Sequence, residues 1–96
     1  MGWEIIFAPQ ALEQLEQIVR FIAQDDPQAA IRFGDYLVDR AKSLATFPEL
    51  GTPYGKPANI RRLLCKSYHI YYRVDRTGHT IEIMDYWHAA RREPSL

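Results

Sequence analysis

Apolar residues in the first half of the chain recur at the spacing of two helices. The first stripe consists of Leu12, Leu15, Ile18, Val19 and Ile22. The second stripe consists of Ala30, Phe33, Leu37, Ala41 and Leu44. Each set falls on one face of a helix. Pro9 and Pro27 each suit a first helical position, and Asp26 suits the N-cap of the second helix. The pattern therefore predicts two consecutive helices joined by a short turn at "QDDPQ".

The remaining segments have the composition of strands. Four of them are rich in β-branched and aromatic residues: 3–7 ("WEIIF"), 60–67, 68–74 and 80–87. Residues 75–79 read as a turn, and residues 47–57, with three prolines and two glycines, predict a loop. The order β-α-α-β-β-β predicts an α+β fold. We expect one small domain over residues 1–96, with an antiparallel helix hairpin packed on one face of a mainly antiparallel sheet.

Strict alternation along the strands assigns their side chains to the two faces of the sheet. The residues expected to face the helices are Ile70, Tyr72, Val74, Ile81 and Ile83. Those expected to face outward are His69, Tyr71, Arg73, Glu82, Met84, Tyr86 and His88. We also expect Arg62 rather than Arg61 to point outward. This outward face has the composition of a binding or catalytic site. A half-solvated sheet face has the same composition, so the pattern leaves both interpretations open.

Residues 86–94, "YWHAARREP", concentrate aromatic and basic side chains after the last strand. We expect Trp87 to pack against the sheet edge or a helix. Arg91 follows the strand and can fold back beside Tyr86 and His88. Earlier in the sheet, the single cysteine, Cys65, is expected to be a small buried hydrophobe.

The net charge is zero, but the two halves of the chain differ. Residues 1–50 carry four basic and eight acidic residues, a balance of −4, whereas residues 51–96 carry eight basic and four acidic residues, a balance of +4. The chain as a whole lacks the positive field of a strong nucleic-acid binder. One cysteine and the lack of HxxxH or CxxC pairs indicate a reducing compartment and no metal or cofactor. Without a long apolar run, we expect a cytoplasmic protein with no membrane partner.

Four segments, in this order, resemble the ParE/RelE superfamily of toxins from bacterial type II toxin–antitoxin operons, known also from plasmid stabilization. They are "ALEQLEQIVRFIAQDDPQAA", "FPELG", "IRRLLCKSYHIYYRV" and "IEIMDYWHAAR". The resemblance covers residues 3–92. It implies a small α+β toxin that is neutralised by the C-terminal segment of a cognate antitoxin. The other end of such an antitoxin binds operator DNA, so this chain would reach operator DNA only through the antitoxin.

The superfamily has two kinds of action. ParE-like members block DNA gyrase, whereas RelE-like members cut mRNA on the ribosome without a metal. Two features favour the ParE branch: the neutral charge, because binding to RNA relies on many phosphate contacts, and His69, which stands where RelE-like nucleases usually carry an arginine. Our first expectation is therefore a gyrase inhibitor that causes growth arrest. The alternatives are a ribosome-dependent mRNA endonuclease and a non-toxic co-repressor that binds the antitoxin.

Each expectation has its own candidate residues. A nuclease would use His88 and His69 for proton transfer and Arg73 to hold the phosphate. A target-binding surface would use Arg62, Arg73, Tyr86, His88 and Arg91. For the antitoxin, we predict an apolar groove at the helix hairpin, formed by residues left over from a small core: Phe21, Tyr36 and Val38.

Overall fold

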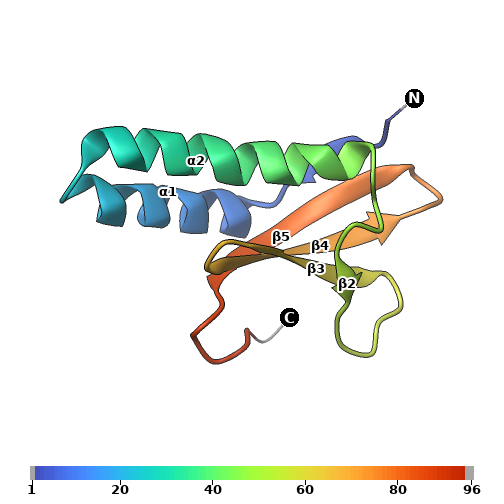
Figure 1. Cartoon of the computed structure of the whole chain (residues 1–96). Helices are drawn as coiled ribbons and strands as arrows, with labels where there is room; N and C mark the ends of the chain where they lie inside the picture. The colour runs from blue at the N-terminus through green and yellow to red at the C-terminus, as the bar shows by residue number, and fades with distance from the viewer. Residues whose placement is uncertain (1, 95–96) are drawn as a thin grey trace.

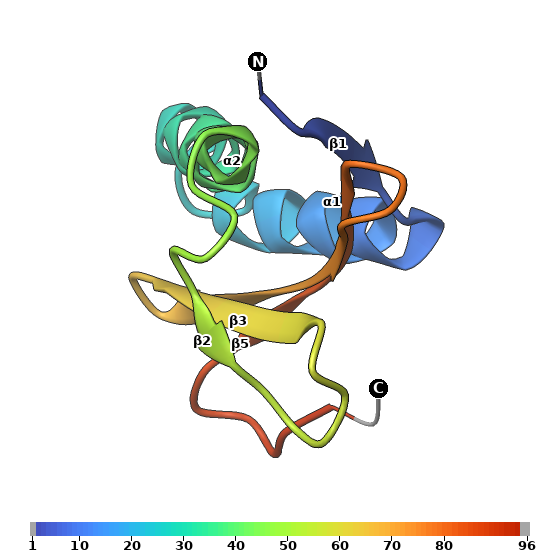
Figure 2. The same cartoon turned by 90° about the vertical axis from the view of Figure 1, so that its right-hand side faces the viewer.

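The computed structural model describes residues 2–94. Its elements, in chain order, are β1 (Glu4–Phe7), α1 (Pro9–Ala23), α2 (Pro27–Lys42), the 3-10 turn η1 (Ser43–Ala45), β2 (Thr52–Pro53), β3 (Ile60–Cys65), β4 (Tyr68–Asp75) and β5 (Thr80–His88). Figure 1 shows the two helices side by side and antiparallel, and Figure 2 shows both helices on one side of the sheet. The predicted α+β fold with a helix hairpin on one sheet face is confirmed.

The ends of the helices follow from their first residues. Pro9 and Pro27 begin α1 and α2, where the missing N–H of proline removes no helical hydrogen bond. The Asp26 side chain accepts a hydrogen bond from the Ala29 N–H at 3.1 Å, which confirms the predicted N-cap. Ala8 precedes α1 in an extended conformation and provides no side-chain cap. At the turn between the helices, the N–H groups of Asp25 and Asp26 donate to the Ile22 carbonyl at 3.1 and 3.0 Å, so the end of α1 and the cap of α2 both fix the turn.

The predicted helix stripes are confirmed in α2 and need one correction in α1. Four of the five residues predicted for the second stripe are buried: Ala30, Leu37, Ala41 and, in η1, Leu44. In α1, the fully buried position is Ala11, whereas Leu12 is 51% exposed. At about 100° per residue, Leu12 lies about 90° away from the centre of the face shared by Ala11, Leu15 and Ile18. The stripe predicted from the sequence included the larger Leu12, whereas close packing of the helix places the smaller Ala11 in the core.

The sheet has the strand order β1-β5-β4-β3-β2. The first strand pairs parallel with β5, and the other neighbours pair antiparallel. The two-residue strand β2, which pairs Thr52 with Arg62 and Pro53 with Arg61, lies within the segment that the sequence predicted to be a loop. A strand this short that contains proline fits only at a sheet edge, and β2 occupies that place.

A β-bulge interrupts the pairing of β4 with β5. Tyr71 is opposite Asp85, but the next residue, Tyr72, is opposite Ile83, so that Met84 has no partner. An extra residue of this kind moves every later side chain of the strand to the other face. The alternation predicted for β5 therefore holds only as far as Ile83.

The residues after Met84 consequently face the opposite way to the prediction. Tyr86 is opposite Ile70, and His88 is opposite Tyr68; Tyr86 and Ile70 both belong to the core beneath the helices. The prediction that Tyr86 and His88 point away from the helices is wrong, because it extended strict alternation across the bulge. Trp87, which is opposite His69, takes their expected place on the outer face.

The core joins the helix hairpin to the sheet and also fixes the 47–57 segment. Cys65 is buried in this core, as predicted. The Tyr72 hydroxyl donates to the Pro48 carbonyl at 2.8 Å and accepts from the Gly51 N–H at 2.9 Å. A Cβ at Gly51 would lie 2.5 Å from the Arg62 carbonyl oxygen, so only glycine allows this approach to β3. Neither helix, within residues 2–94, has the length and apolar character needed to cross a membrane.

Candidate functional site

The face of the sheet that lies away from the helices, here called the open face, carries most of the residues that the sequence analysis predicted there. The strand register puts Arg62 and Leu64 of β3 beside Tyr71 and His69 of β4, respectively, and Arg73 farther along β4. These positions alternate with core residues, so the outward orientation predicted for Arg62, His69, Tyr71 and Arg73 is confirmed. Two segments lie on the same side of the sheet: the loop that follows β2 and the residues that follow β5 (Figure 2).

Arg62 contacts both an acidic and an aromatic side chain on the open face. Its Nη1 donates to Oε2 of Glu93 at 2.8 Å, and its guanidinium lies 5.0 Å from the centre of the Tyr54 ring. The Tyr54 ring in turn meets the buried Tyr71 ring edge-on at 4.9 Å. Hydrogen bonding to Tyr71, and then to Glu93, raises the pKa of Arg62. Arg62 is thus a cation that packs on an aromatic ring and forms an ion pair with one carboxylate.

Residues 89–94, here called the strap, run back beneath the end of β5. The Ala89 N–H donates to the Ser67 carbonyl at 2.8 Å, and the indole N–H of Trp87 donates to the Arg92 carbonyl at 2.6 Å. Arg91 stacks on Trp87, with its guanidinium carbon 4.1 Å from the ring centre. Trp87 is partly exposed and lies outside the core cluster. The expected packing of Trp87 on the sheet edge or a helix is therefore wrong: it packs against the strap.

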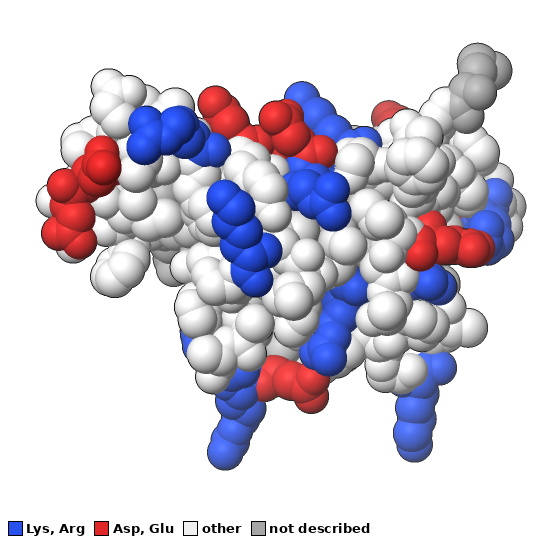
Figure 3. All heavy atoms as spheres, viewed as in Figure 1, with Lys and Arg blue, Asp and Glu red and all other residues white. Residues whose placement is uncertain are grey.

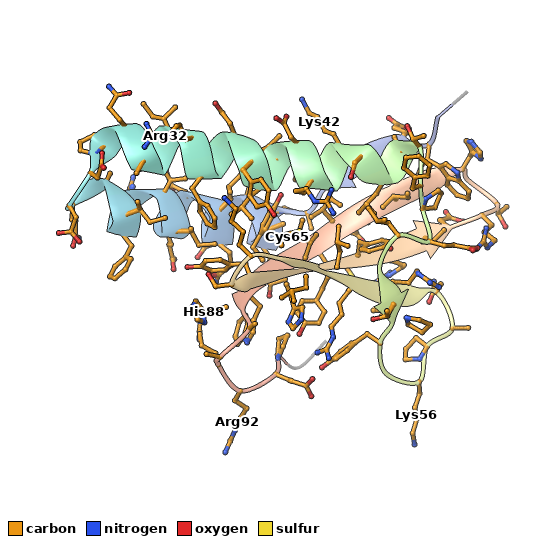
Figure 4. All side chains as sticks on the ribbon, in the orientation of Figure 1. Arg32, Lys42, Lys56, Cys65, His88 and Arg92 are labelled. Atoms are coloured by element: carbon orange, nitrogen blue, oxygen red, sulfur yellow. The ribbon has the colours of Figure 1, made fainter. Side chains whose placement is uncertain are left out.

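His88 and Tyr86 lie on the helix side of the sheet. The Tyr86 hydroxyl donates to the Leu37 carbonyl of α2 at 3.1 Å, and the residue is buried; burial raises the pKa of Tyr86. The His88 ring meets Tyr68 edge-on at 5.0 Å, and its Nδ1 accepts from the Ala90 N–H at 3.1 Å. Figure 4 shows His88 at the end of β5, below α1. Neither side chain belongs to the open face.

The three residues named for RNA cleavage are not brought together. His69 and Arg73 are four residues apart on one strand, which separates their backbones by about 13 Å, and His88 is on the other face of the sheet. Burial, followed by the charge of Arg62, lowers the pKa of His69, so this ring is neutral near pH 7. Arg73 makes a loose ion pair with Glu82 at 3.9 Å.

Asp85 is a functional candidate that the sequence analysis missed. It is 3% exposed, and its Oδ1 accepts no hydrogen bond from any described residue. Burial raises the pKa of Asp85, while the side chain of Gln10 opposes this rise. An aspartate in the middle of a strand is unusual, and this signal could have identified it. Tyr54 and Glu93 were also missed, since the sequence alone does not bring a loop and a terminal segment to Arg62. Among residues 2–94, no three His, Cys, Asp or Glu side chains lie close enough together to hold a metal ion.

A second surface lies between the two helices, on the side away from the sheet. Its lining is mostly apolar: Leu15, Val19, Ala30, Ile31, Gly34, Asp35 and Val38. Of the residues predicted for an antitoxin groove, Val38 lines this surface and Phe21 is 68% exposed near the end of α1. Tyr36 lies elsewhere, against Phe33 and beneath Lys66. The helix side thus offers an apolar groove, and its use by an antitoxin stays a prediction.

Comparison with known proteins gives consistent matches over nearly the whole chain. The family described as the ParE toxin of the type II toxin–antitoxin system, parDE, matches residues 5–93. The predicted toxin Y4kP of Sinorhizobium fredii (strain NBRC 101917 / NGR234) is 33% identical over 89 residues, which cover 91% of this chain and 88% of that protein. Among solved structures, a chain of the chromosomal ParDE system of P. aeruginosa superposes with a TM-score of 0.77 at 20% identity, covering 91% of this chain and 96% of that chain. A chain of the RelBE2 toxin–antitoxin complex of Mycobacterium tuberculosis gives a TM-score of 0.69 at 20% identity, covering 92% and 99%. These two structures share the fold.

Proposed function

Because the chain belongs to the ParE toxin family of type II toxin–antitoxin systems, we propose that it arrests growth by binding a target protein through the open face, and that this target is DNA gyrase. The family makes the chain a toxin component with a cognate antitoxin as its partner. The proposal adds the mode of action and the surface. Arg62 and Arg73 are the cations of that surface, and Tyr54 and Trp87 are its partly exposed aromatic contacts.

The dispersal of the candidate nuclease residues is the observation that supports this proposal. Cleavage of RNA through the 2′-hydroxyl needs a base, an acid and a phosphate-binding cation around one reacting phosphate. His88 is on the helix side, and His69 and Arg73 are far apart along β4. A binding surface has no such requirement, because its contacts can be spread over the whole face. Tyr86 is buried and His88 faces α1, so neither is part of the proposed surface.

Induction of the chain alone would test the target. We expect growth arrest with filamentation and DNA-damage signalling, and inhibition of supercoiling when purified gyrase and relaxed plasmid are mixed with the chain. Co-expression of the antitoxin should restore growth, which serves as the control. New mRNA ends at codon positions, mapped before any DNA damage, would instead assign the chain to the ribosome-dependent nucleases. Normal growth together with antitoxin binding would identify a co-repressor.

We further propose that the antitoxin binds the apolar groove between α1 and α2. An amphipathic helix can bury its apolar face in such a groove, and Ile31, which lines it, is 58% exposed in the chain alone. Gly34 keeps the helices close, since a Cβ there would lie 2.9 Å from Val19 Cγ2. The two partners would thus use opposite sides of the molecule.

A further inference from the structure

The strap already presents an acidic side chain to the cation of the open face. We propose that Glu93 is a built-in ligand of Arg62, and that an acidic segment of the target protein displaces it and opens the strap. This inference rests on the proposed use of the open face for target binding. It adds the chemistry of the ligand and a mechanism that limits access to the surface.

The contacts of Arg62 show that a carboxylate is the group this position accepts. Its neighbours in β4 and in the loop are aromatic, and Glu93 is the one carboxylate in residues 2–94 that forms an ion pair with it. The Arg62 side chain is only 30% exposed. A partly buried guanidinium over the Tyr54 ring favours an anionic partner, because losing Glu93 would leave its charge without one. A carboxylate from another protein could replace Glu93 as the partner of Arg62.

The contacts of the strap are weak enough for it to detach from the open face. It contains no helix or strand, and residues 89–93 are exposed. Beyond Ala90, the contacts that hold it are all at the surface. They are the Arg91 N–H bond to the His88 carbonyl, the stacking of Arg91 on Trp87, the hydrogen bond from Trp87 to the Arg92 carbonyl and the ion pair of Glu93. Glu93 is itself 62% exposed, and an exposed ion pair contributes little. Opening the strap therefore disturbs neither the core nor the sheet.

The charges around the strap favour an acidic partner. Figure 4 shows Lys56 and Arg92 projecting from two separate segments on the side of the sheet away from the helices. The space-filling view in Figure 3 shows the same side, with two extended basic side chains and an acidic group between them. When Glu93 leaves Arg62, the cations Arg62, Lys56 and Arg92 remain on the side of the sheet away from the helices. Opposite charge of this kind steers and orients an acidic segment.

The test uses the purified full chain, with hexaglutamate as the probe. Binding is followed by the NMR signals of the Trp87 indole N–H and the Arg62 Nε–H. Hexaglutamate should move both signals in the wild type. It should bind the Glu93→Gln variant about two- to fivefold more tightly, because the internal competitor has lost its charge. Arg62→Gln should lose the binding.

Glu49→Gln is the matched control. Glu49 is as exposed as Glu93, at 64% against 62%, and it pairs with Arg76 at 2.7 Å. Arg76 lies over Trp3, which packs against the core on the helix side. The control removes the same charge without touching the strap, so its affinity for hexaglutamate should equal that of the wild type.

Three results would overturn the proposal. The first is equal affinity for hexaglutamate in the wild type and Glu93→Gln. The second is binding that leaves the Trp87 indole signal in place. The third is an RNA hexamer that displaces the strap while hexaglutamate does not, which would make the ligand a nucleic acid. No gyrase is present in this experiment, so failure of the proposed function would show separately, in the supercoiling assay.

Discussion

At the scale of single residues, two buried polar groups of β5 differ in how their hydrogen-bonding capacity is met. The Tyr86 hydroxyl donates to the Leu37 carbonyl and links the sheet to α2. The Oδ1 of Asp85, one residue earlier, has no partner among the described residues. A satisfied buried hydroxyl stabilises the fold modestly, whereas a buried carboxylate without a full set of partners costs stability. The two residues therefore lead to predictions of opposite sign.

Tyr86→Phe should lower the free energy of unfolding by about 1 kcal/mol, because it removes one buried hydrogen bond and keeps the ring. Chemical denaturation would measure the loss. Since Tyr86 lies in the core, the variant should retain wild-type growth arrest at a temperature where it is fully folded. Loss of toxicity in a fully folded variant would show that the hydroxyl contacts a target.

Asp85→Asn should raise the free energy of unfolding at pH 7 by about 1 kcal/mol, because the charged form of Asp85 is the one that burial disfavours. The pKa of Asp85 is raised in the folded state, so the folded chain holds this proton more tightly than the unfolded chain. Wild-type stability is then reduced as the pH rises from the ordinary aspartate range through the raised pKa. The advantage of the variant should be present at pH 7 and vanish near pH 3, where both side chains are neutral.

Urea denaturation at the two pH values would measure this difference. A variant that is no more stable than the wild type at pH 7 would indicate that Gln10 and the charge of Arg91, which both lower the pKa of Asp85, already compensate for its burial.

At the scale of elements, one side chain caps α2 at the turn between the helices. Asp26 caps α2 through the Ala29 N–H, and its neighbour Asp25 makes no such contact in the described hydrogen bonds. Both aspartates are exposed and carry the same charge. Comparing them separates the effect of the cap from the effect of charge near the helix N-terminus.

Asp26→Ala should destabilise the chain by about 1 kcal/mol, the usual cost of losing an N-cap. For a domain of this size the loss corresponds to a fall in Tm of about 4–8 °C. Asp25→Ala, the matched control, should change stability by less than about 0.5 kcal/mol. Calorimetry of both variants would test this, and equal losses would attribute the effect to charge alone.

The elements also show how far the sequence could predict the fold. Helix stripes, caps and strand order depend on local spacing, and α1, α2 and the four longer strands were predicted from them. The bulge at Met84 has no local signature, since one extra residue among strand-forming residues leaves the composition unchanged. It moved Tyr86 and His88 off the candidate surface and brought Trp87 onto it. Arg62 and Arg73 belong to β3 and β4, whose pairing with each other is regular, and their predicted orientation was correct.

At the scale of the whole molecule, the uneven charge of the sequence becomes a difference between two layers. The acidic first half of the chain forms both helices, and the basic second half forms most of the sheet. The groove between the helices is apolar, whereas the open face carries arginines and aromatic rings. A molecule with two such different sides can bind two partners by different chemistry, one by burial of apolar surface and one by charge.

Variants on the two sides should therefore separate toxicity from neutralisation. Arg62→Gln with Arg73→Gln should weaken target binding by at least about tenfold, because each cation lost removes an electrostatic contact of the open face. This variant should relieve growth arrest and still co-purify with the antitoxin. Val38→Glu places a charge in the apolar groove, so it should remain toxic and lose rescue by the antitoxin.

Arg32→Gln with Arg20→Gln is the control for lost charge, since both arginines are exposed on the helices and outside the open face. Growth of induced cultures without antitoxin measures the toxicity of each variant, and growth with antitoxin measures its neutralisation. Circular dichroism verifies that each variant is folded. If Val38→Glu is folded but harmless, target and antitoxin share the helix side, and the open face is not the toxic surface. If the open-face variant loses the antitoxin as well, the antitoxin reaches around the sheet, and a single partner covers both sides. Only the crossed pattern, in which each variant loses one partner and keeps the other, fits a molecule whose two layers act independently.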